Sequence, residues 1–425
     1  MHQRLGYSGV VPATRMTRNT LRNMSKHARL HYLDHASLGR PGRKTIERVR
    51  REVARASQFA TSGTLETLRQ LKAVEDARRR IARFVHADLE SVLLVGNTTQ
   101  ALGTIATALP LHREDNVLVA DIEFMGATVV WRGICRRLGV ELVPVPSTGG
   151  QIAAEHFARF ANSRTKAIVI STVQEVSGCR ADVEAIREVA SKSGAYVIAD
   201  GIQEVGAIPV FFKELGVDAY CAGGHKWMRS PFGLGFAALS QRLLNVLDPS
   251  YHGYLALAEP EMGWDRYMGL TSRSPFDLLP VREDAVRLET GGFPNWLGAA
   301  ALDTAASELE STGPKNVWAR IRRLRKRLVA GLSEMGVEIL GGADAPERTH
   351  SGIVTLHVSG STNQERLLVR RLTQEHIHVS LRYVSGIGGI RVAVHESNNA
   401  GDVDALLDVV RSFSRGAAYK GSWRA

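Results

Sequence analysis

Short apolar runs alternate with amphipathic segments along the chain from about residue 90. Continuous apolar runs occupy residues 92–95, 117–120, 142–145, 167–170 and 196–199. Runs without polar alternation indicate strands buried on both faces, as in a parallel sheet covered by helices. The segment 182–193 instead places its apolar residues on one helical face, after an aspartate suited to cap the helix. This alternation predicts an α/β doubly wound domain with a mainly parallel central sheet.

The pattern changes after about residue 300. Residues 315–335 carry one apolar stripe at helical spacing, which predicts a single long helix. Further strands are predicted at 352–358, 379–383 and 390–394, and a last helix at 402–413. These elements indicate a smaller C-terminal α+β domain. We therefore divide the chain into a basic N-terminal arm (1–30), a large domain (31–300) and a small domain (301–425).

The composition is that of a globular enzyme. The 425 residues are enough for two domains, and 44% are hydrophobic and 23% charged. No apolar run approaches the length of a transmembrane helix. The three cysteines, Cys135, Cys179 and Cys221, are far apart and form no CxxC pair, which disfavours a metal site or disulfide framework. This cysteine usage favours a reducing compartment, and we expect a cytoplasmic protein without a metal.

The formal net charge is +11. A basic protein can bind nucleic acid, or it can attract acidic small molecules. The Lys and Arg residues are spread along the chain without interleaved aromatic residues, so we expect no nucleic-acid partner and no membrane partner. The stretch before Asp34 has basic but no acidic residues. A transit peptide and a docking arm both fit this stretch, and the arm is favoured because no clear hydrophobic signal core is present.

Two strand ends carry polar residues where ligands bind in open α/β sheets. Asn97, Thr98 and Thr99 follow the first apolar run, where a helix begins. Hydroxyls and free backbone N–H groups at a helix N-terminus suit a phosphate, although an ordinary N-cap has the same composition. Asp200 ends the fifth run. A buried carboxylate needs a partner, which a protonated pyridine nitrogen would supply; a capping aspartate is the alternative.

Lys226 forms a third candidate site. It follows the apolar segment 220–222 and a Gly-Gly-His turn, and the Gly-rich segment 231–235 comes next. Desolvation behind a strand would lower the pKa of the amine and make it a usable nucleophile. A lone lysine is usually a solvated surface group, so Lys226 is informative only together with the other two sites.

The three candidate sites, in their order along the chain, resemble the motifs of the class V aminotransferase family of fold-type I pyridoxal 5'-phosphate (PLP) enzymes. That family includes cysteine desulfurases and isopenicillin-N-epimerase-like proteins. Asp200-x-x-Gln203 followed by His225-Lys226 is the most specific part, and the resemblance runs from about Tyr32 to the C-terminal helix. It implies a large PLP-binding domain, a small C-terminal domain, and a homodimer with its active sites at the subunit interface.

The resemblance also implies roles at the cofactor ring. Lys226 would hold PLP as a Schiff base and then shuttle a proton at the substrate α-carbon. Asp200 would keep the pyridine nitrogen protonated, and Gln203 would hydrogen-bond the phenolic oxygen. The cofactor is the electron sink, while the protein supplies orientation and electrostatics.

The surroundings of the cofactor follow from the same resemblance. Thr98, Thr99 and His225 would contact the phosphate or its surroundings. Phe124 would lie over the ring. Gly292 belongs to a segment, Glu289-Thr290-Gly291-Gly292, that resembles the loop reaching the cofactor of the neighbouring subunit.

The amino-acid substrate would meet a further group of residues. Arg391, on the strand 390–394, resembles the arginine that binds the substrate carboxylate, which a guanidinium can hold bidentately. Arg382 is a second candidate, with a solvent-exposed strand-edge charge as its alternative. His35, within the motif Tyr32-Leu33-Asp34-His35-Ala36, would complete the substrate site.

Three departures from the family pattern reduce the number of reactions that the chain is expected to catalyse. Gly223 stands where relatives often have a phosphate-binding hydroxyl. Glu175 stands where relatives usually have asparagine or an aromatic residue; it meets the polar end of the substrate or points into solvent. The loop 383–389 has no cysteine, although cysteine desulfurases need a nucleophilic thiol there. Ordinary desulfurase chemistry is therefore disfavoured.

We expect an aminotransferase-like (transferase) or carbon–sulfur lyase-like enzyme that acts at the α-carbon of an amino acid, in specialised metabolism. Epimerisation and decarboxylation share the first steps and stay open as alternatives. A catalytically silent binding protein on the same fold is the alternative from another class. The combined presence of Asp200, Gln203 and Lys226 argues against it.

Overall fold

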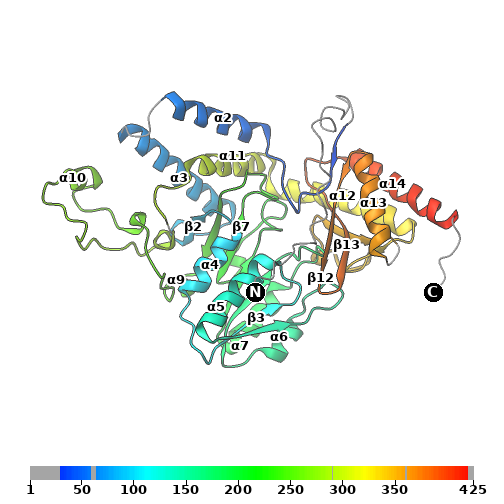
Figure 1. Ribbon diagram of the computed structural model, residues 1–425, viewed down its shortest axis with the longest axis horizontal. Coiled ribbons are helices and arrows are strands. Elements are labelled where there is room, and N and C mark those ends of the chain that lie inside the picture. Colours follow the sequence, from blue (N-terminus) through cyan, green and yellow to red (C-terminus); the bar gives the residue numbers. More distant parts are fainter. Residues whose placement is uncertain (1–28, 59–63, 290, 359–360, 420–425) are drawn as a thin grey trace, which may run out of the picture.

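The computed structural model describes residues 29–58, 64–289, 291–358 and 361–419 (Figure 1). Its centre is a seven-stranded sheet with strand order β2-β8-β7-β6-β5-β3-β4. The strands are β2 (Val92–Val95), β3 (Asn116–Ala120), β4 (Glu141–Val145), β5 (Thr165–Ser171), β6 (Tyr196–Asp200), β7 (Ala219–Gly223) and β8 (Gly235–Leu239). Strand β8 pairs antiparallel with both its neighbours, while β4, β3, β5, β6 and β7 pair in parallel. The predicted α/β class with a mainly parallel sheet is confirmed.

The continuous apolar runs of the strands supply two cores, one on each face of the sheet. Leu118, Ile168 and Val197 belong to the first core, which also contains residues of α3 (Thr64–Phe84), α7 (Val183–Ser193) and α11 (Trp296–Thr312). Val119 and Val169 belong to the second core, with α4 (Thr98–Ala108) and α5 (Met125–Leu138). Because successive strand residues point to opposite faces, a strand covered on both sides has to be apolar at every position.

A four-stranded antiparallel sheet, ordered β12-β13-β10-β9, forms the C-terminal part. Its strands are β9 (Glu338–Ile339), β10 (Ile353–His357), β12 (Ser380–Val384) and β13 (Ile387–Ala393). The helices α12 (Pro314–Glu334), α13 (Thr362–Gln374) and α14 (Ala400–Tyr419) accompany it (Figure 1). The long helix predicted from the stripe at 315–335 is therefore present as α12.

The N-terminal end of the described chain is joined to this C-terminal part. Strand β1 (His31–Tyr32) pairs in parallel with β11 (Ile377–His378). Helix α11 packs on α2 (Arg43–Gln58) and α3, and it runs across residue 300. The boundary between the large and small domains at that residue stays a prediction. The predicted basic arm lies outside the described residues, except for its last two positions.

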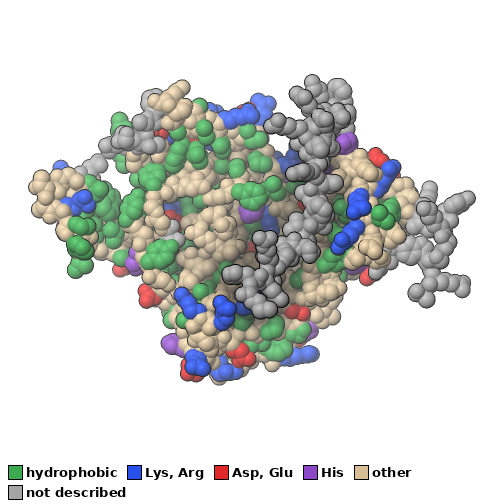
Figure 2. All heavy atoms as spheres, viewed as in Figure 1, with side chains coloured by type: hydrophobic (Ala, Val, Ile, Leu, Met, Phe, Trp, Pro, Cys, Tyr) green, Lys and Arg blue, Asp and Glu red, His purple; other side chains and the backbone are tan. Residues whose placement is uncertain are grey.

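Short helices elsewhere in the chain include α6 (Ala154–Phe160), α8 (Phe212–Leu215) and α9 (Gln241–Leu244). A segment that includes α10 (Trp264–Met268) projects at the left of Figure 1. Hydrophobic side chains are exposed on it, as Figure 2 shows, including Phe276 (88% exposed) and Leu278 (100% exposed). Among the described helices, none is long and apolar enough to span a membrane.

Candidate active site

The three predicted strand ends meet at one cavity. Register places Ser171 beside Asp200, and Asp200 beside Cys221, so the carboxyl ends of β5, β6 and β7 lie next to each other. A cavity of about 360 Å³ opens there and reaches the N-terminus of α4. The predicted site residues that line it are Thr98, Thr99, Phe124, Asp200, His225, Lys226, Arg382 and Arg391. Residues from distant parts of the sequence are thus brought together around one space.

Lys226 is the nucleophile candidate of this cavity. Its residue exposure is 9%, and burial lowers the pKa of the amine to about 8, although the charge of Asp200 opposes the shift. The Lys226 Nζ lies 5.5 Å from the centroid of the Phe124 ring. A lysine with such a pKa has a larger neutral fraction near physiological pH than an ordinary lysine, and the neutral amine can attack an aldehyde carbon.

The backbone around Lys226 is fixed by a close crossing with the N-terminal segment. The Gly39 N–H donates a hydrogen bond of 2.8 Å to the carbonyl of His225. A Cβ at Gly39 would lie 1.8 Å from the carbonyl oxygen of Lys226. Only glycine lets the two backbones approach this closely without a shift, because it lacks a Cβ.

Asp200 is a buried carboxylate at the end of β6. Its exposure is 4%, and one oxygen accepts a hydrogen bond of 2.9 Å from the Ile202 N–H. Burial raises the pKa of this carboxyl to about 6, while Lys226 acts in the opposite direction. A cation placed beside Asp200 would offset the desolvation cost and return the pKa toward its ordinary range. A protonated pyridine nitrogen is such a cation.

The N-terminus of α4 forms the other end of the cavity. The Asn97 side chain caps the helix by accepting a hydrogen bond of 2.9 Å from the Gln100 N–H. The Thr98 hydroxyl oxygen accepts a hydrogen bond of 2.8 Å from the Gly223 N–H and so ties α4 to β7. The helix dipole and hydroxyls of this end suit a phosphate group.

His225 lies beside the phosphate end. Its ring stacks on Phe232 with a centroid distance of 4.5 Å, and burial lowers the imidazole pKa to about 4. The ring is therefore neutral at physiological pH and can offer a hydrogen bond but no charge. A Cβ at Gly223 would lie 2.9 Å from the His225 ring, so any side chain at this position would require the ring to move.

Arg391 and Arg382 enter the cavity from the C-terminal sheet. Arg391 on β13 is 1% exposed and forms an ion pair with Glu175 at 2.8 Å and with Asp34 at 3.4 Å. Burial lowers the pKa of Arg391, and both acids oppose the shift. Arg382 on β12 donates hydrogen bonds to the Leu381 carbonyl at 2.9 Å and to a serine hydroxyl at 3.1 Å. Both predicted carboxylate ligands thus reach the site, but Arg391 already has an acidic partner.

Three predicted residues do not line the cavity. His35 is 1% exposed and packs against His395, with the two rings tilted and 4.9 Å apart, so its contact with substrate stays a prediction. Gln203 donates to the Ala36 carbonyl at 3.0 Å and accepts from the Trp227 indole at 2.8 Å, which leaves one amide N–H for a ligand. Gly292 is not among the residues that line the cavity of its own chain.

Comparison with known proteins agrees with this arrangement. The family model described as "Aminotransferase class-V" matches residues 31–406. The chain belongs to the class V aminotransferase family. It is a PLP-dependent enzyme acting at the α-carbon of an amino acid, and the sequence prediction of family, cofactor and enzyme class is confirmed.

Curated relatives of this class V enzyme include proteins named cysteine desulfurases. A probable cysteine desulfurase of Vibrio cholerae serotype O1 is 26% identical over 351 residues, covering 79% of this chain and 81% of the relative. A probable cysteine desulfurase of Pyrococcus abyssi is 23% identical over 378 residues, with coverage of 85% and 86%.

Solved structures show the same fold. A cystine C–S lyase, C-DES, described in complex with cysteine persulfide, has a TM-score of 0.80 at 20% identity and covers 90% of this chain and 97% of its own. The apo cysteine desulfurase of Thermococcus onnurineus NA1 has a TM-score of 0.76 at 20% identity, with coverage of 91% and 95%. At this level of identity the likeness establishes the fold.

The residues of the class V enzyme fit PLP. The desolvated Asp200 suits the pyridinium, the α4 N-terminus suits the phosphate, and Lys226 suits the aldehyde. Phe124 lines the same cavity and faces the Lys226 amine, where a ring could stack. When bound, PLP supplies an electron sink for charge that develops at the substrate α-carbon.

The three thiols of this enzyme are buried away from the cavity. Cys135, Cys179 and Cys221 are free and buried, and burial raises the pKa of each thiol. None of them is among the described residues that line the cavity. The turn between β12 and β13 contains Ser385 and Gly386.

Sequence reasoning missed two polar residues of the site. Ser37 accepts hydrogen bonds from Arg391 at 2.6 Å and from Arg382 at 3.1 Å. Glu123 is 3% exposed, accepts a hydrogen bond of 2.7 Å from the Ser171 N–H, and has a pKa raised to about 7 by burial. Ser37 gave no sequence signal, because its position depends on how the N-terminal segment crosses the site. The only signal for Glu123 was its place next to Phe124.

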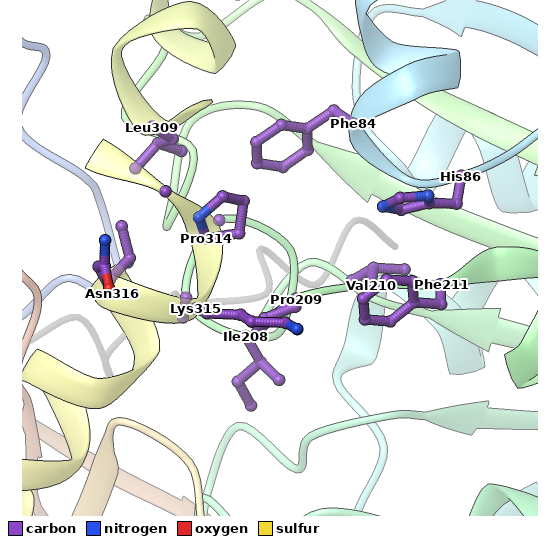
Figure 3. A pocket seen from close by; sticks show the side chains of 14 residues that line it. Phe84, His86, Ile208, Pro209, Val210, Phe211, Leu309, Pro314, Lys315 and Asn316 are labelled. Atoms are coloured by element: carbon purple, nitrogen blue, oxygen red, sulfur yellow. The ribbon is translucent and has the colours of Figure 1, made fainter. Parts of the chain in front are cut away.

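A second cavity, of about 420 Å³, lies at the end of α3 and at the junction of α11 and α12 (Figure 3). Phe84, Ile208, Phe211 and Leu309 make its lining mainly apolar. Lys315 and His86 are the only titratable side chains among the described residues that line it. Without an acid beside the lysine, this cavity lacks the charge arrangement found at Lys226.

Proposed function

We propose that this enzyme cleaves the C–S bond of an S-substituted cysteine and releases the sulfur as a thiol. The observation that carries the proposal is the absence of a thiol among the described residues that line the cavity. Without such a thiol the enzyme has no acceptor for transferable sulfur at the site. The names of its relatives, cysteine desulfurases and a cystine C–S lyase, support a sulfur-containing amino acid as substrate.

The side chains of the cavity have distinct tasks in this proposal. Lys226 would hold the cofactor and would take the proton from the substrate α-carbon. Asp200 would stabilise a positive charge on the pyridine nitrogen. Thr98 and the α4 N-terminus would orient the phosphate, and Phe124 would cover the ring. A guanidinium group of the C-terminal sheet orients the substrate carboxylate, which sets the bond that breaks.

The test is to incubate holoenzyme with L-cysteine, L-cystine, S-alkyl cysteine conjugates and L-alanine, each with and without a 2-oxo acid. Elimination from a conjugate consumes one water and should give equal amounts of thiol, pyruvate and ammonia. Amino-group transfer to the 2-oxo acid without thiol release would favour a transaminase. A D-amino acid or carbon dioxide as product would favour the epimerase or the decarboxylase.

Cysteine variants test whether a thiol of the enzyme accepts the sulfur. Single Cys→Ser variants at positions 135, 179 and 221, and the triple variant if it folds, should keep the rate of thiol release. Loss of activity in any single variant that retains its melting temperature would instead support a thiol mechanism.

We also propose a homodimer in the cytoplasm. The projecting segment supports the dimer, because Tyr251, Met268, Phe276 and Leu278 are exposed apolar residues on one extension (Figure 2). Glu289 anchors the base of the projection by pairing with Arg78 and accepting a 2.6 Å hydrogen bond from the Leu94 N–H. The three free thiols support a reducing compartment. Light scattering should give twice the chain mass, and Leu278→Asp should lower it toward the monomer.

A further inference from the structure

Glu175 is the residue of the cavity that departs from the family pattern and also has a defined partner. Its side chain lines the cavity and is 19% exposed. The carboxylate accepts a hydrogen bond of 2.8 Å from Arg391 Nη1, and the Glu175 carbonyl accepts another of 3.2 Å from the same nitrogen. Glu175 therefore does not point freely into solvent. Both Glu175 and Arg391 line the ligand cavity.

The remaining donors of Arg391 are also engaged. Nη2 donates to the Ser37 hydroxyl at 2.6 Å and lies 3.4 Å from Asp34 Oδ1, and Nε donates to Ser380 at 3.2 Å. A carboxylate binds a guanidinium best through two parallel N–H groups. No such pair of N–H groups is open on Arg391. A substrate carboxylate would have to displace Glu175 and would meet its negative charge at close range.

Arg382 presents the opposite situation in the same cavity. Its guanidinium donates only to neutral groups, the Leu381 carbonyl and the Ser37 hydroxyl. Within the part of the chain that the structure describes, no carboxylate lies within 4.0 Å of it, whereas Arg391 has two such partners. Strand β12 holds Arg382 opposite Gly389 of β13, two residues before Arg391. Arg382 is thus the cavity guanidinium whose charge is not neutralised by a paired acid.

We infer that Glu175 determines how the substrate is bound. As a fixed counter-ion it occupies the N–H groups of Arg391, which leaves Arg382 to bind the substrate carboxylate. The inference rests on the proposed function only in that the cavity binds an amino acid. Arg391 then acts as a positioning residue, which holds Glu175, Ser37 and Asp34 in place. The resemblance to the family predicts that Arg391 binds the carboxylate. In this chain the glutamate at position 175 occupies Arg391, so Arg382 takes that role.

The experiment compares two probes that differ only in the carboxylate, L-alanine and ethylamine. Their dissociation constants are measured on holoenzyme by titrating the visible absorption of the bound cofactor, so turnover is not needed. Arg382→Gln should reduce the preference for L-alanine over ethylamine by roughly tenfold to a hundredfold, the range for one charged hydrogen-bonded contact. Ethylamine itself should bind both proteins within about threefold.

Glu175→Gln should have the opposite effect to Arg382→Gln. It keeps a hydrogen-bond acceptor for Arg391 but removes the charge, so a carboxylate can replace it. The single variant should raise the preference for L-alanine by about tenfold. The double variant Glu175→Gln/Arg382→Gln should recover most of the preference lost in Arg382→Gln, because Arg391 becomes available.

The matched control is Glu141→Gln, which makes the same change at the Glu141–Arg164 pair, where both side chains are 56% exposed. It should leave the preference unchanged. If Arg382→Gln fails to fold, Arg382→Lys can replace it, because lysine keeps the charge but lacks the paired N–H groups of a guanidinium. This variant should lose less of the preference for L-alanine over ethylamine. An unchanged preference in folded Arg382 variants, or no recovery in the double variant, would overturn the inference. Absence of any spectral response to either probe in the wild type would contradict the proposed function instead.

Discussion

Burial moves the pKa values of Lys226 and Asp200 toward each other. The amine falls to about 8 and the carboxyl rises to about 6, in both cases mainly because the charged form is desolvated. Bound PLP would reduce the desolvation free energy of both groups, because the amine would be bonded to the cofactor and the carboxylate would gain a pyridinium partner. The two groups are therefore prepared for this ligand by their surroundings and not by their residue types alone.

The lowered pKa of Lys226 predicts how fast apoenzyme captures its cofactor. Only the neutral amine attacks the aldehyde, and its fraction rises with pH through the pKa. The rate of appearance of the visible band after mixing with PLP should therefore rise with pH and reach half its maximum near pH 8. A midpoint near the ordinary lysine value of 10.5 would show that the amine is not desolvated. The Lys226→Arg variant should give no covalent band at any pH.

The residues that could be predicted from sequence are those at the ends of apolar runs. Asp200 ends the buried strand β6 and Lys226 follows the buried strand β7, so their polar character stands out against their neighbours. Ser37 and the pairing of Glu175 with Arg391 depend on contacts between segments more than 200 residues apart, as the separation of 216 for the Glu175–Arg391 pair illustrates. No local pattern encodes such a contact.

At the scale of elements, the central strands were predictable because both of their faces are covered. The strand predicted at 167–170 appears as Thr165–Ser171, and that at 196–199 as Tyr196–Asp200. The pairing of β1 with β11 was not predicted, because each strand is only two residues long and carries no periodicity. The same pairing brings the segment with Asp34 and Ser37 to the active site.

The crossing of Gly39 with the Lys226 turn gives a test at this scale. Gly39→Ala would place a methyl group 1.8 Å from the Lys226 carbonyl oxygen, so one backbone must shift. We expect a loss of stability of about 1–3 kcal/mol, the usual cost of overpacking, and PLP binding at least about tenfold weaker. Both are measured on apoenzyme, by thermal unfolding and by fluorescence titration with PLP.

Gly103→Ala is the matched control for this crossing. Gly103 lies inside α4, and a Cβ there meets nothing within 4 Å. Alanine should stabilise the helix by up to about 1 kcal/mol and leave PLP binding unchanged. If Gly39→Ala behaved like Gly103→Ala, the close crossing would not hold the lysine in position.

At the scale of the whole molecule, a stack of buried rings connects the N-terminal segment, the Lys226 turn and the C-terminal part. His35 and His395 are 4.9 Å apart, and Trp227 stacks on His395 at 5.7 Å. The His395 Nε2 also makes a hydrogen bond of 2.9 Å with the Trp227 carbonyl. Burial lowers the His395 pKa to about 3 and the His35 pKa well below its ordinary value. Both imidazoles are thus neutral in the folded protein.

This stack predicts the response to acid. Below pH 6.5 the unfolded chain binds a proton at His395 that the folded protein excludes, so stability falls as the pH falls from 6.5 toward 3. At pH 5.5 this one group lowers the free energy of unfolding by about 1 kcal/mol. His395→Gln keeps an N–H for the Trp227 carbonyl and should flatten the fall of melting temperature between pH 6.5 and 4.5. His112→Gln, at a side chain that is 74% exposed, should keep the wild-type slope.

Chemical trapping shows whether Lys226 holds PLP in this cavity. Holoenzyme is reduced with borohydride, digested, and its peptides are mapped by mass. We expect loss of the visible band and one pyridoxyl group, carried by the peptide that contains Lys226. Unmodified Lys226 with the group on another lysine, or a protein that takes up no pyridoxyl group after incubation with PLP, would contradict it.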